Sequence, residues 1–215
     1  MLRFFLKPQK NVFKPYSEGK RKLKEDSVFK DGTYLRFMFC VFMVAFCFLM
    51  VFSMVPVYYK EQVHMSESLI GIVLAMNGLI IAITEMIIVY KLEGKRSETF
   101  YISIGAFLIG ISFLSLNLSA TVNIVLLSML IITLGEMLMF PFVNTYWVTR
   151  SKNHNRAQYA SIFTISFSLA HVLAPTIGSQ IVKHYGYNSL WYTLAGVCTL
   201  ASVFFYSFRK LNVSS

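Results

Sequence analysis

Hydrophobic and polar positions along this chain follow each other in long blocks rather than at a short period. Short polar segments separate six apolar runs, at about residues 37–59, 68–90, 99–117, 122–144, 157–182 and 190–208. A bilayer core about 30 Å thick needs roughly 20 residues of α-helix to cross it. Every run reaches that length or falls just short of it. The pattern therefore predicts six transmembrane helices.

The same runs exclude β-strands, because long segments without alternation would leave unpaired strand edges in lipid. Composition agrees, since the chain is 56% hydrophobic and 14% charged, with a mean hydropathy of +0.59. Soluble domains carry about 25% charged residues. We therefore expect an all-α, polytopic membrane protein with three parts: a basic cytoplasmic connector at 1–34, a six-helix bundle at 35–210 and a cytoplasmic tail at 211–215.

The positions of the cations predict the orientation of the chain. A net charge of +10 could indicate a nucleic-acid partner, but these cations do not track one face of a soluble domain. Eighteen of the 20 Lys and Arg residues fall in every second polar segment, namely 1–36, 91–98, 149–158 and 209–215. By the positive-inside rule, both termini are cytoplasmic. We expect a multi-pass protein of the cell (inner) membrane, surrounded by lipid, with no nucleic-acid partner.

Signatures of soluble enzymes are missing from the sequence. It contains no Walker loop, no GxGxxG after a strand, no HExxH and no nucleophile elbow. The three cysteines, Cys40, Cys47 and Cys198, all fall within predicted spans and lack metal-ligand spacing. We therefore expect no enzymatic activity, no cofactor and no metal site.

The fourth run has a polar and aromatic face. At 100° per residue, an arc of about 80° contains Thr133, Glu136, Phe140, Asn144 and Trp147. An ionisable residue inside a span is costly, so it is a functional hypothesis by default. In a low-dielectric setting, Glu136 could take up a proton or pair with a cation. We interpret the face as the lining of a substrate or proton pathway. The alternative is a structural Glu136, hydrogen-bonded between helices.

Two further polar residues lie near the middle of their runs. Asn77 in the second run is expected to line the same cavity. His171 in the fifth run could bind substrate or relay a proton, although a lone His on a helix is more often packed and hydrogen-bonded. The fifth run also carries small residues at every fourth position, which would let another helix approach closely: Ser166, Ala170, Ala174 and Gly178.

Glu85 lies near the cytoplasmic end of the second run, six residues before Lys91. We expect it to pair with Arg or Lys from the inner loops and to help close an inner gate. The alternative is an interfacial carboxylate that reaches water.

Several segments together resemble a known family. They are NGLIIAITE at 77–85, LGEMLMFP at 134–141, RAQYA at 156–160 and SLAHVLAPTIG at 168–178. In their order within six spans, they are similar to the carboxyl-terminal half of a major facilitator superfamily transporter, of the drug:proton antiporter type. The resemblance implies that the spans are helices seven to twelve and that residues 1–33 are the central loop. It also implies alternating access, with proton-coupled export of small amphipathic molecules.

The resemblance extends to two loops. The segment 92–96 is similar to the acidic–glycine–basic gating loop of the family but lacks its usual Asp-Arg pair, which leaves Lys95 and Arg96 as the gating cations. Arg156 matches an Arg-Gly pair before helix eleven, with Ala157 in place of the glycine. In antiporter-type members, the main proton-carrying acids tend to lie in the amino-terminal half.

The main departure from the family pattern concerns the amino-terminal half. Met1 falls where a full-length relative would be leaving its sixth helix. We therefore expect an amino-terminal six-helix half as a partner, together with protons and a small-molecule substrate. The rival hypothesis is a truncated or vestigial membrane half that transports nothing by itself.

Overall fold

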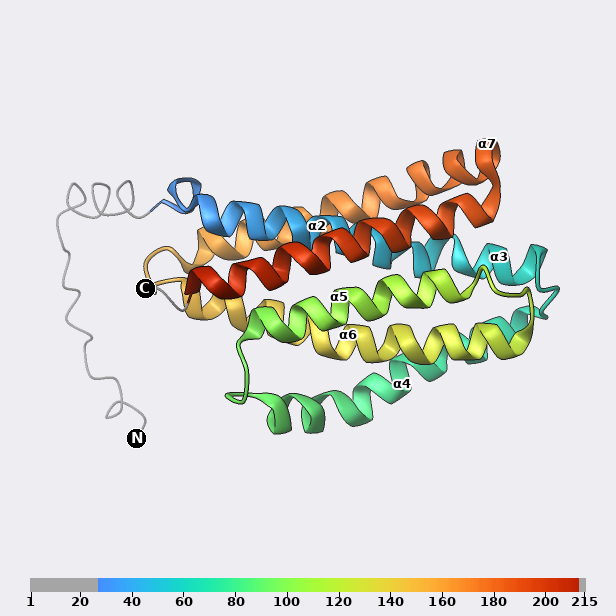
Figure 1. Cartoon of the computed structure of the whole chain (residues 1–215), viewed down its shortest axis with the longest axis horizontal. Helices are drawn as coiled ribbons and strands as arrows, with labels where there is room; N and C mark the ends of the chain where they lie inside the picture. Colours follow the sequence, from blue (N-terminus) through green and yellow to red (C-terminus); the bar gives the residue numbers. More distant parts are fainter. Residues whose placement is uncertain (1–26, 213–215) are drawn as a thin grey trace, which may run out of the picture.

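Helices account for all the regular secondary structure in residues 27–212, the part of the chain that this computed structural model describes. Side chains are described as far as residue 208. The elements are η1 Val28–Lys30, α2 Gly32–Ser53, α3 Val55–Glu61, α4 Glu67–Leu92, α5 Glu98–Ser115, α6 Val122–Arg150 and α7 Arg156–Asn212. They lie side by side in an elongated bundle (Figure 1). The prediction of an all-α fold is confirmed for this part, whereas most of the expected connector at 1–34 lies outside it.

Five helical stretches within the described residues are long and apolar enough to cross a membrane. They are Gly32–Glu61, Glu67–Leu92, Glu98–Ser115, Val122–Arg150 and Arg156–Phe208. The first combines α2 with α3, which meet at Met54, and Pro56 lies in the first turn of α3. Proline is tolerated at that position because its missing N–H would have no helical partner there.

The last two predicted runs form one element, α7, whose two arms meet at Gly186. This residue has φ 79° and ψ 172°, and the chain turns back on itself there (Figure 1). Such backbone angles are essentially restricted to glycine. The polar segment 183–189, which separates the last two predicted runs, is not a separate loop, because the reversal takes place at one glycine.

Glycines set the contact between α5 and α6. A Cβ atom added to Gly105 would lie 2.7 Å from the carbonyl oxygen of Gly135, and one added to Gly135 would lie 2.8 Å from Cγ1 of Ile109. The two backbones can approach this closely only because both positions lack a side chain.

The small-residue ridge of the fifth run also packs as predicted. Its four members are buried, and a Cβ atom on Gly178 would meet Met50 and Met54 of α2. The ridge is therefore a surface on which the first arm of α7 contacts α2.

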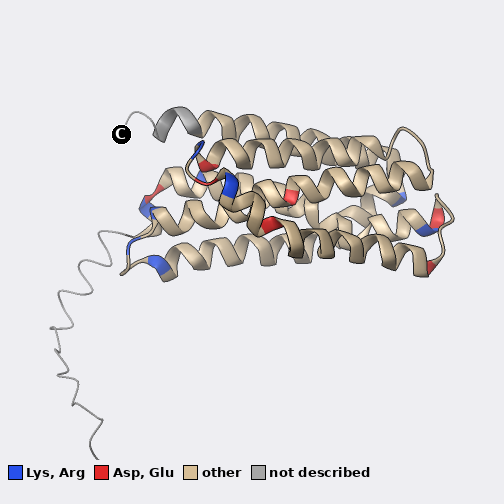
Figure 2. Cartoon of the chain, turned by 90° about the horizontal axis from the view of Figure 1, so that it is seen from below, with Lys and Arg blue, Asp and Glu red and all other residues tan. Residues whose placement is uncertain are grey.

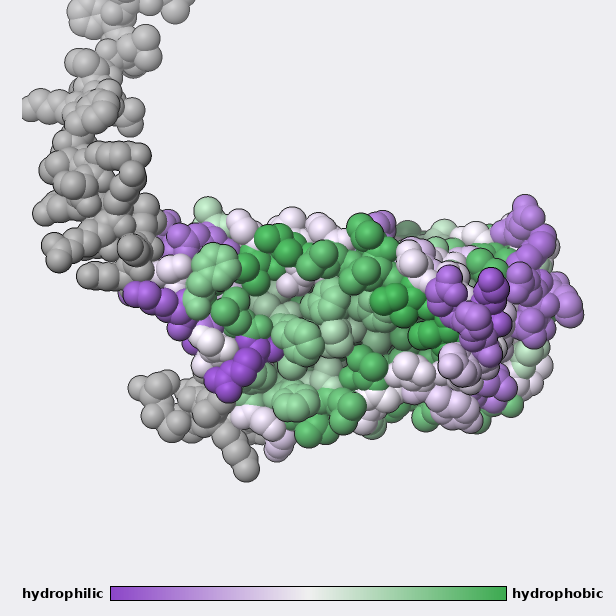
Figure 3. Space-filling model, turned by 90° about the horizontal axis from the view of Figure 1, so that it is seen from above, coloured by the Kyte–Doolittle hydropathy of each residue, from purple (hydrophilic) through white to green (hydrophobic). Residues whose placement is uncertain are grey.

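The surface of the bundle is divided into bands. A broad hydrophobic band separates two hydrophilic ends (Figure 3), and the lysines and arginines gather toward those ends (Figure 2). Large apolar side chains are exposed along α4 and along the first arm of α7, including Leu79, Ile83, Met86, Ile165, Leu169 and Val172. Such a belt on a helical bundle is typical of a protein embedded in lipid.

Candidate functional site

A buried polar cluster joins α4 to α6 inside the hydrophobic band. Nδ2 of Asn77 donates hydrogen bonds of 2.9 Å to both Oε1 of Glu136 and Oγ1 of Thr133. Only 7% of Asn77, 7% of Glu136 and 1% of Thr133 is exposed. The Thr133 hydroxyl in turn donates to the backbone oxygen of Met129, at 2.6 Å. The carboxylate thus has an amide donor in a setting from which solvent is largely excluded.

The sequence builds this cluster by helical spacing. Thr133 and Glu136 are three residues apart on α6, so their side chains point to the same side. Asn77 faces them from α4, which packs mainly on α6 among the described helices. Farther along the same seam, the Thr84 hydroxyl lies 3.1 Å from Sδ of Met137. Polar side chains therefore connect α4 to α6 within the membrane-embedded region. In membranes, small residues and polar groups commonly mediate contacts between helices.

A small recess adjoins the cluster. It measures about 130 Å³, and its two polar lining residues are Asn77 and Thr133. The rest of its lining is apolar: Val73, Met76, Ile80, Leu126, Met129 and Leu130. The recess therefore lies between α4 and α6 and is lined by Asn77, the residue that donates a hydrogen bond to Glu136.

The other predicted pathway residues are more widely dispersed. Phe140 is half-buried, with its ring centroid 4.8 Å from that of Phe48 and 5.7 Å from that of Phe167, so it joins α6 to α2 and α7. Asn144 is exposed and accepts a hydrogen bond of 3.2 Å from Nε1 of Trp147. His171 is exposed on the first arm of α7. The structure thus brings Asn77 and Glu136 together but shows no hydrogen bond from Asn144 or His171 to this cluster.

The predicted gating residues lie toward one end of the bundle. Glu85 is half-buried, eight residues or about 12 Å along α4 from Asn77. Within residues 27–208, no ion pair joins Glu85 to a basic residue. Lys95, Arg96 and Arg156 are exposed in or beside loops, and Cζ of Arg96 lies 5.8 Å from the Phe100 ring centroid. The gating roles of these four residues stay predictions.

Sequence reasoning missed a second polar cluster, where α2 begins. Asp31 caps α2 by accepting a hydrogen bond of 3.0 Å from the backbone N–H of Tyr34. Arg150, at the end of α6, donates to both carboxylate oxygens of Asp31, at 2.6 and 2.8 Å. Tyr159, near the start of α7, donates to Asp31 at 2.8 Å. One carboxylate therefore ties three helices together at this end of the bundle.

Hydrogen bonding decides the charge state of Asp31. Burial by itself would raise the pKa of this carboxyl, but the hydrogen bonds from Arg150, the Tyr34 backbone and Tyr159 outweigh it and hold the pKa below its ordinary value. The Tyr34 hydroxyl extends the cluster by donating to the backbone oxygen of Tyr159 at 2.8 Å. The cap position of Asp31 before a helix was a readable signal, but its pairing with Arg150, 119 residues away, was not.

An apolar belt, charged ends and a polar cluster buried between long helices define a multi-pass membrane protein. Two overlapping stretches of the chain, residues 1–175 and 37–214, match the family model described as Major Facilitator Superfamily. The chain therefore belongs to the major facilitator superfamily, as its sequence segments predicted.

Relatives of this chain share the family. It is 22% identical over 188 residues to a "Na(+), Li(+), K(+)/H(+) antiporter" of Planococcus maritimus, a match that covers 81% of this chain and 44% of that protein. It is 25% identical over 134 residues to the "Uncharacterized MFS-type transporter YttB" of Bacillus subtilis (strain 168), covering 61% of this chain and 34% of the relative. The chain thus spans less than half the length of these two relatives.

A solved structure supports the fold. The crystal structure of a POT family transporter in complex with a thioalcohol-conjugated peptide superimposes with a TM-score of 0.67 and 20% sequence identity. The superposition covers 88% of this chain and 44% of that chain. The bundle of this chain therefore has the fold of about half of that transporter.

Proposed function

We propose that this chain is the carboxyl-terminal half of a secondary carrier that exports small amphipathic molecules in exchange for protons. In this proposal the chain crosses the cell (inner) membrane six times, because each arm of α7 exceeds the roughly 20 residues that one crossing needs. The start of α2 and the end of α7 lie at the same end of the bundle (Figure 1), which supports an even number of crossings. The cation-rich polar segments favour a cytoplasmic position for that end.

The observation that carries the proposal is the hydrogen bond between Asn77 and Glu136. A carboxyl group between two apolar helices is costly to keep charged unless it is paired, so it is suited to gaining and losing a proton. The Asn77 amide can serve both states, because its nitrogen donates to a carboxylate and its oxygen can accept from a carboxylic acid. Proton exchange at Glu136 would therefore change the bonding between α4 and α6.

A change in the bonding between α4 and α6 matters for transport if the carrier works by alternating access. Carriers of this kind move substrate by rocking helical repeats around a site near the membrane midplane. α4 is one of the two least enclosed candidate spans, and in the described part it packs mainly on α6. Protonation of Glu136 would loosen or rearrange that seam and so couple the proton to the movement of α4. Phe140, Asn144 and His171 would line the substrate path, and Glu85 would act with Lys95, Arg96 and Arg156 at the inner gate.

A second candidate substrate comes from a relative whose printed name is a Na⁺, Li⁺, K⁺/H⁺ antiporter. Hard cations prefer oxygen ligands. The Glu136 carboxylate and the Thr133 hydroxyl both accept a hydrogen bond from Nδ2 of Asn77, so their oxygens belong to one cluster. Alkali-cation exchange would use the same cluster as a cation site. Everted membrane vesicles distinguish the two, because added Na⁺ would release stored protons in one case and an amphipathic cationic dye would do so in the other.

The rival hypothesis remains a membrane half that transports nothing by itself. Its test uses liposomes that contain residues 1–215 alone, or residues 1–215 co-expressed with an amino-terminal six-helix half from a full-length relative, with a pH-sensitive dye inside. Substrate-driven proton movement only in the paired sample supports a carrier half. No proton movement in either sample, for dye or for Na⁺, supports the vestigial alternative.

A further inference from the structure

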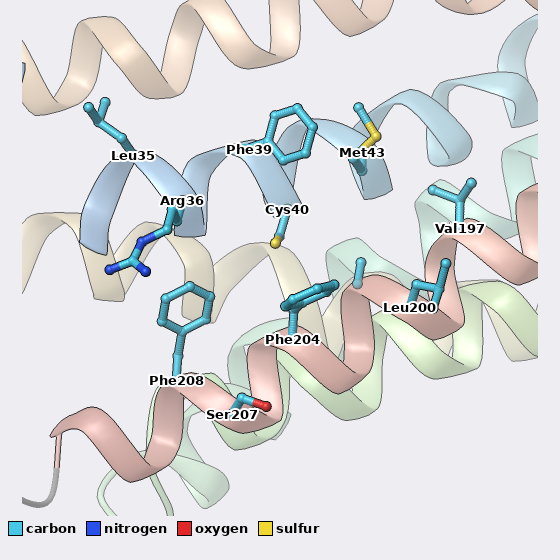
Figure 4. Close-up of a pocket in the computed structure, with 11 residues that line it drawn as sticks. Leu35, Arg36, Phe39, Cys40, Met43, Val197, Leu200, Phe204, Ser207 and Phe208 are labelled. Carbon is cyan, nitrogen blue, oxygen red and sulfur yellow. The ribbon is translucent and has the colours of Figure 1, made fainter. Parts of the chain in front are cut away.

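An apolar groove lies between the first half of α2 and the last part of α7. Its volume is about 690 Å³, within the range of roughly 300–1,000 Å³ that is usual for ligand sites. Figure 4 shows Arg36 and Phe208 at one end of the groove and Met43 and Val197 at the other. Apart from Arg36 and Ser207, the lining is apolar or weakly polar: Leu35, Phe39, Cys40, Met43, Val197, Leu200, Ala201, Phe204 and Phe208.

The walls of the groove face outward. Phe39 is 62% exposed, Leu200 64% and Phe204 58%, on two neighbouring helices. Within the hydrophobic band of the protein, the medium around such side chains is lipid. The side chains that line an empty groove would lack van der Waals contacts on that side. An acyl chain in the groove would supply these contacts, so its binding there is favoured.

Arg36 supplies a charged end to this apolar groove. Its Nε donates to the backbone oxygen of Gly32 at 3.1 Å, and it forms no ion pair with any side chain that the structure describes. Arg150, at the same end of the bundle, is instead occupied by Asp31. The planar guanidinium of an arginine presents several N–H donors that match the oxygens of a phosphate.

The distances along α2 fit one phospholipid. Arg36 follows the start of α2 by about one turn, and Met43 lies seven residues or about 10 Å deeper. A cation at a helix end with an apolar groove below it matches the layout of a lipid, with the phosphate above the acyl chain. A partner helix would need a seam along the whole membrane thickness of about 30 Å, which is much longer than this groove.

We propose that the groove is a binding site for a single anionic phospholipid, with its phosphate on Arg36 and an acyl chain against Phe39, Leu200 and Phe204. The surrounding charge supports this choice, because Lys30, Lys152 and Arg156 are also exposed at this end of the bundle. Basic residues near a membrane surface attract anionic lipids at about 1 kcal/mol each. The site is independent of the substrate pathway around Glu136.

Tryptophan quenching tests the site in the full chain in nanodiscs. A Phe204→Trp variant places a reporter in the groove, and Val203→Trp places a matched reporter on the same helix at a residue that is 62% exposed but does not line the groove. The discs contain phosphatidylcholine with rising fractions of brominated phosphatidylglycerol or brominated phosphatidylcholine, and the signal of the unmodified chain is subtracted. We expect brominated phosphatidylglycerol to quench the groove reporter at about fivefold lower mole fraction than brominated phosphatidylcholine.

Charge variants complete the test. Adding Arg36→Gln to the Phe204→Trp chain should remove the preference for the anionic lipid, whereas adding Lys30→Gln, which neutralises an exposed cation outside the groove lining, should retain it. The matched reporter of the Val203→Trp chain should respond to both lipids alike. Equal quenching of the groove reporter by the two lipids would overturn the proposal in favour of ordinary surrounding lipid. An absence of quenching by either would overturn it in favour of a groove covered by another protein segment.

Discussion

Asn77 donates a hydrogen bond of 2.9 Å from Nδ2 to Oε1 of Glu136, and this bond joins two long helices across the interior of the bundle. Both side chains are 7% exposed. The same nitrogen also reaches Thr133, so one amide holds two polar groups of α6. Protonation of a buried carboxylate that is hydrogen-bonded to a neighbouring helix changes its bond to that helix.

The first prediction concerns the strength of this bond. Asn77→Ala removes the donor and leaves the Glu136 carboxyl buried, so we expect the free energy of unfolding in detergent to fall by about 1 kcal/mol, the usual scale of polar contacts between membrane helices. In a Glu136→Ala background, which removes the acceptor, the same Asn77→Ala change should cost clearly less. Strictly additive effects of the two substitutions would show that the two side chains are not energetically coupled.

A second prediction concerns the contact of α5 with α6. Gly105→Ala should destabilise the bundle by about 1–3 kcal/mol, the usual cost of overpacking, because its Cβ would press on the backbone of Gly135. Gly78→Ala is the matched control, since nothing lies within 4 Å of a Cβ at that position of α4. Thermal unfolding should leave the control unchanged or slightly more stable. Equal losses in both variants would contradict the proposed close approach.

The third prediction follows from the charge state of Asp31. Because the pKa of Asp31 is lowered in the folded protein, the charged carboxylate stabilises the fold. This contribution is complete above the ordinary carboxyl value of about 3.9 and is lost as the pH falls through the lowered folded value.

Asp31→Asn should therefore reduce stability at neutral pH and flatten the loss of stability on acidification. The measurement is the melting temperature in detergent between neutral pH and about pH 3, a range that brackets the ordinary carboxyl value. Glu93→Gln, which neutralises an exposed carboxylate beside α4, is the control and should keep the profile of the unmodified chain. An Asp31→Asn profile that matches this control would mean that the contact with Arg150 does not stabilise the fold.

The fourth prediction tests the orientation. Cysteines introduced at Lys95 and Asn153, both exposed, should not react with a membrane-impermeant maleimide added to intact cells, but should react after permeabilisation. Lys183 is exposed between the last two predicted runs, in a cation-poor segment that the alternation of sides places outside, so Lys183→Cys should react in intact cells. Background labelling should be low because the three native cysteines are buried. Labelling at 95 or 153 from outside would reverse or invalidate the proposed topology.

Much of the fold was readable from the sequence because lipid imposes strict demands on length and polarity. The first four apolar runs correspond to helical stretches with ends that shift by a few residues, and α6 extends six residues past its predicted end, to Arg150. The reversal at Gly186 was less predictable. The flanking sequence is polar enough to indicate a loop, and only the backbone angles of one glycine show that it is not one.

The candidate site was only partly predictable for a similar reason. Helical spacing shows that Thr133 and Glu136 share a face, but it does not show which helix lies opposite, so the bond to Asn77 required the structure. The same spacing placed Asn144 on that face, yet by the end of α6 the face has left the contact with α4 and the side chain is exposed. The contact between Asp31 and Arg150 depends on how distant helix ends meet.

The central claim, that Glu136 couples protons to transport, is tested most directly by proton flux in liposomes that contain both carrier halves. Glu136→Gln keeps the size of the side chain and an oxygen that can accept from Asn77, but it cannot exchange a proton. We expect the variant to remain folded and to bind its substrate while substrate-driven proton movement is lost. Glu67→Gln, which neutralises an exposed carboxylate in the first turn of α4, should leave proton movement unaffected. Proton movement in Glu136→Gln equal to that of the unmodified carrier would contradict the claim.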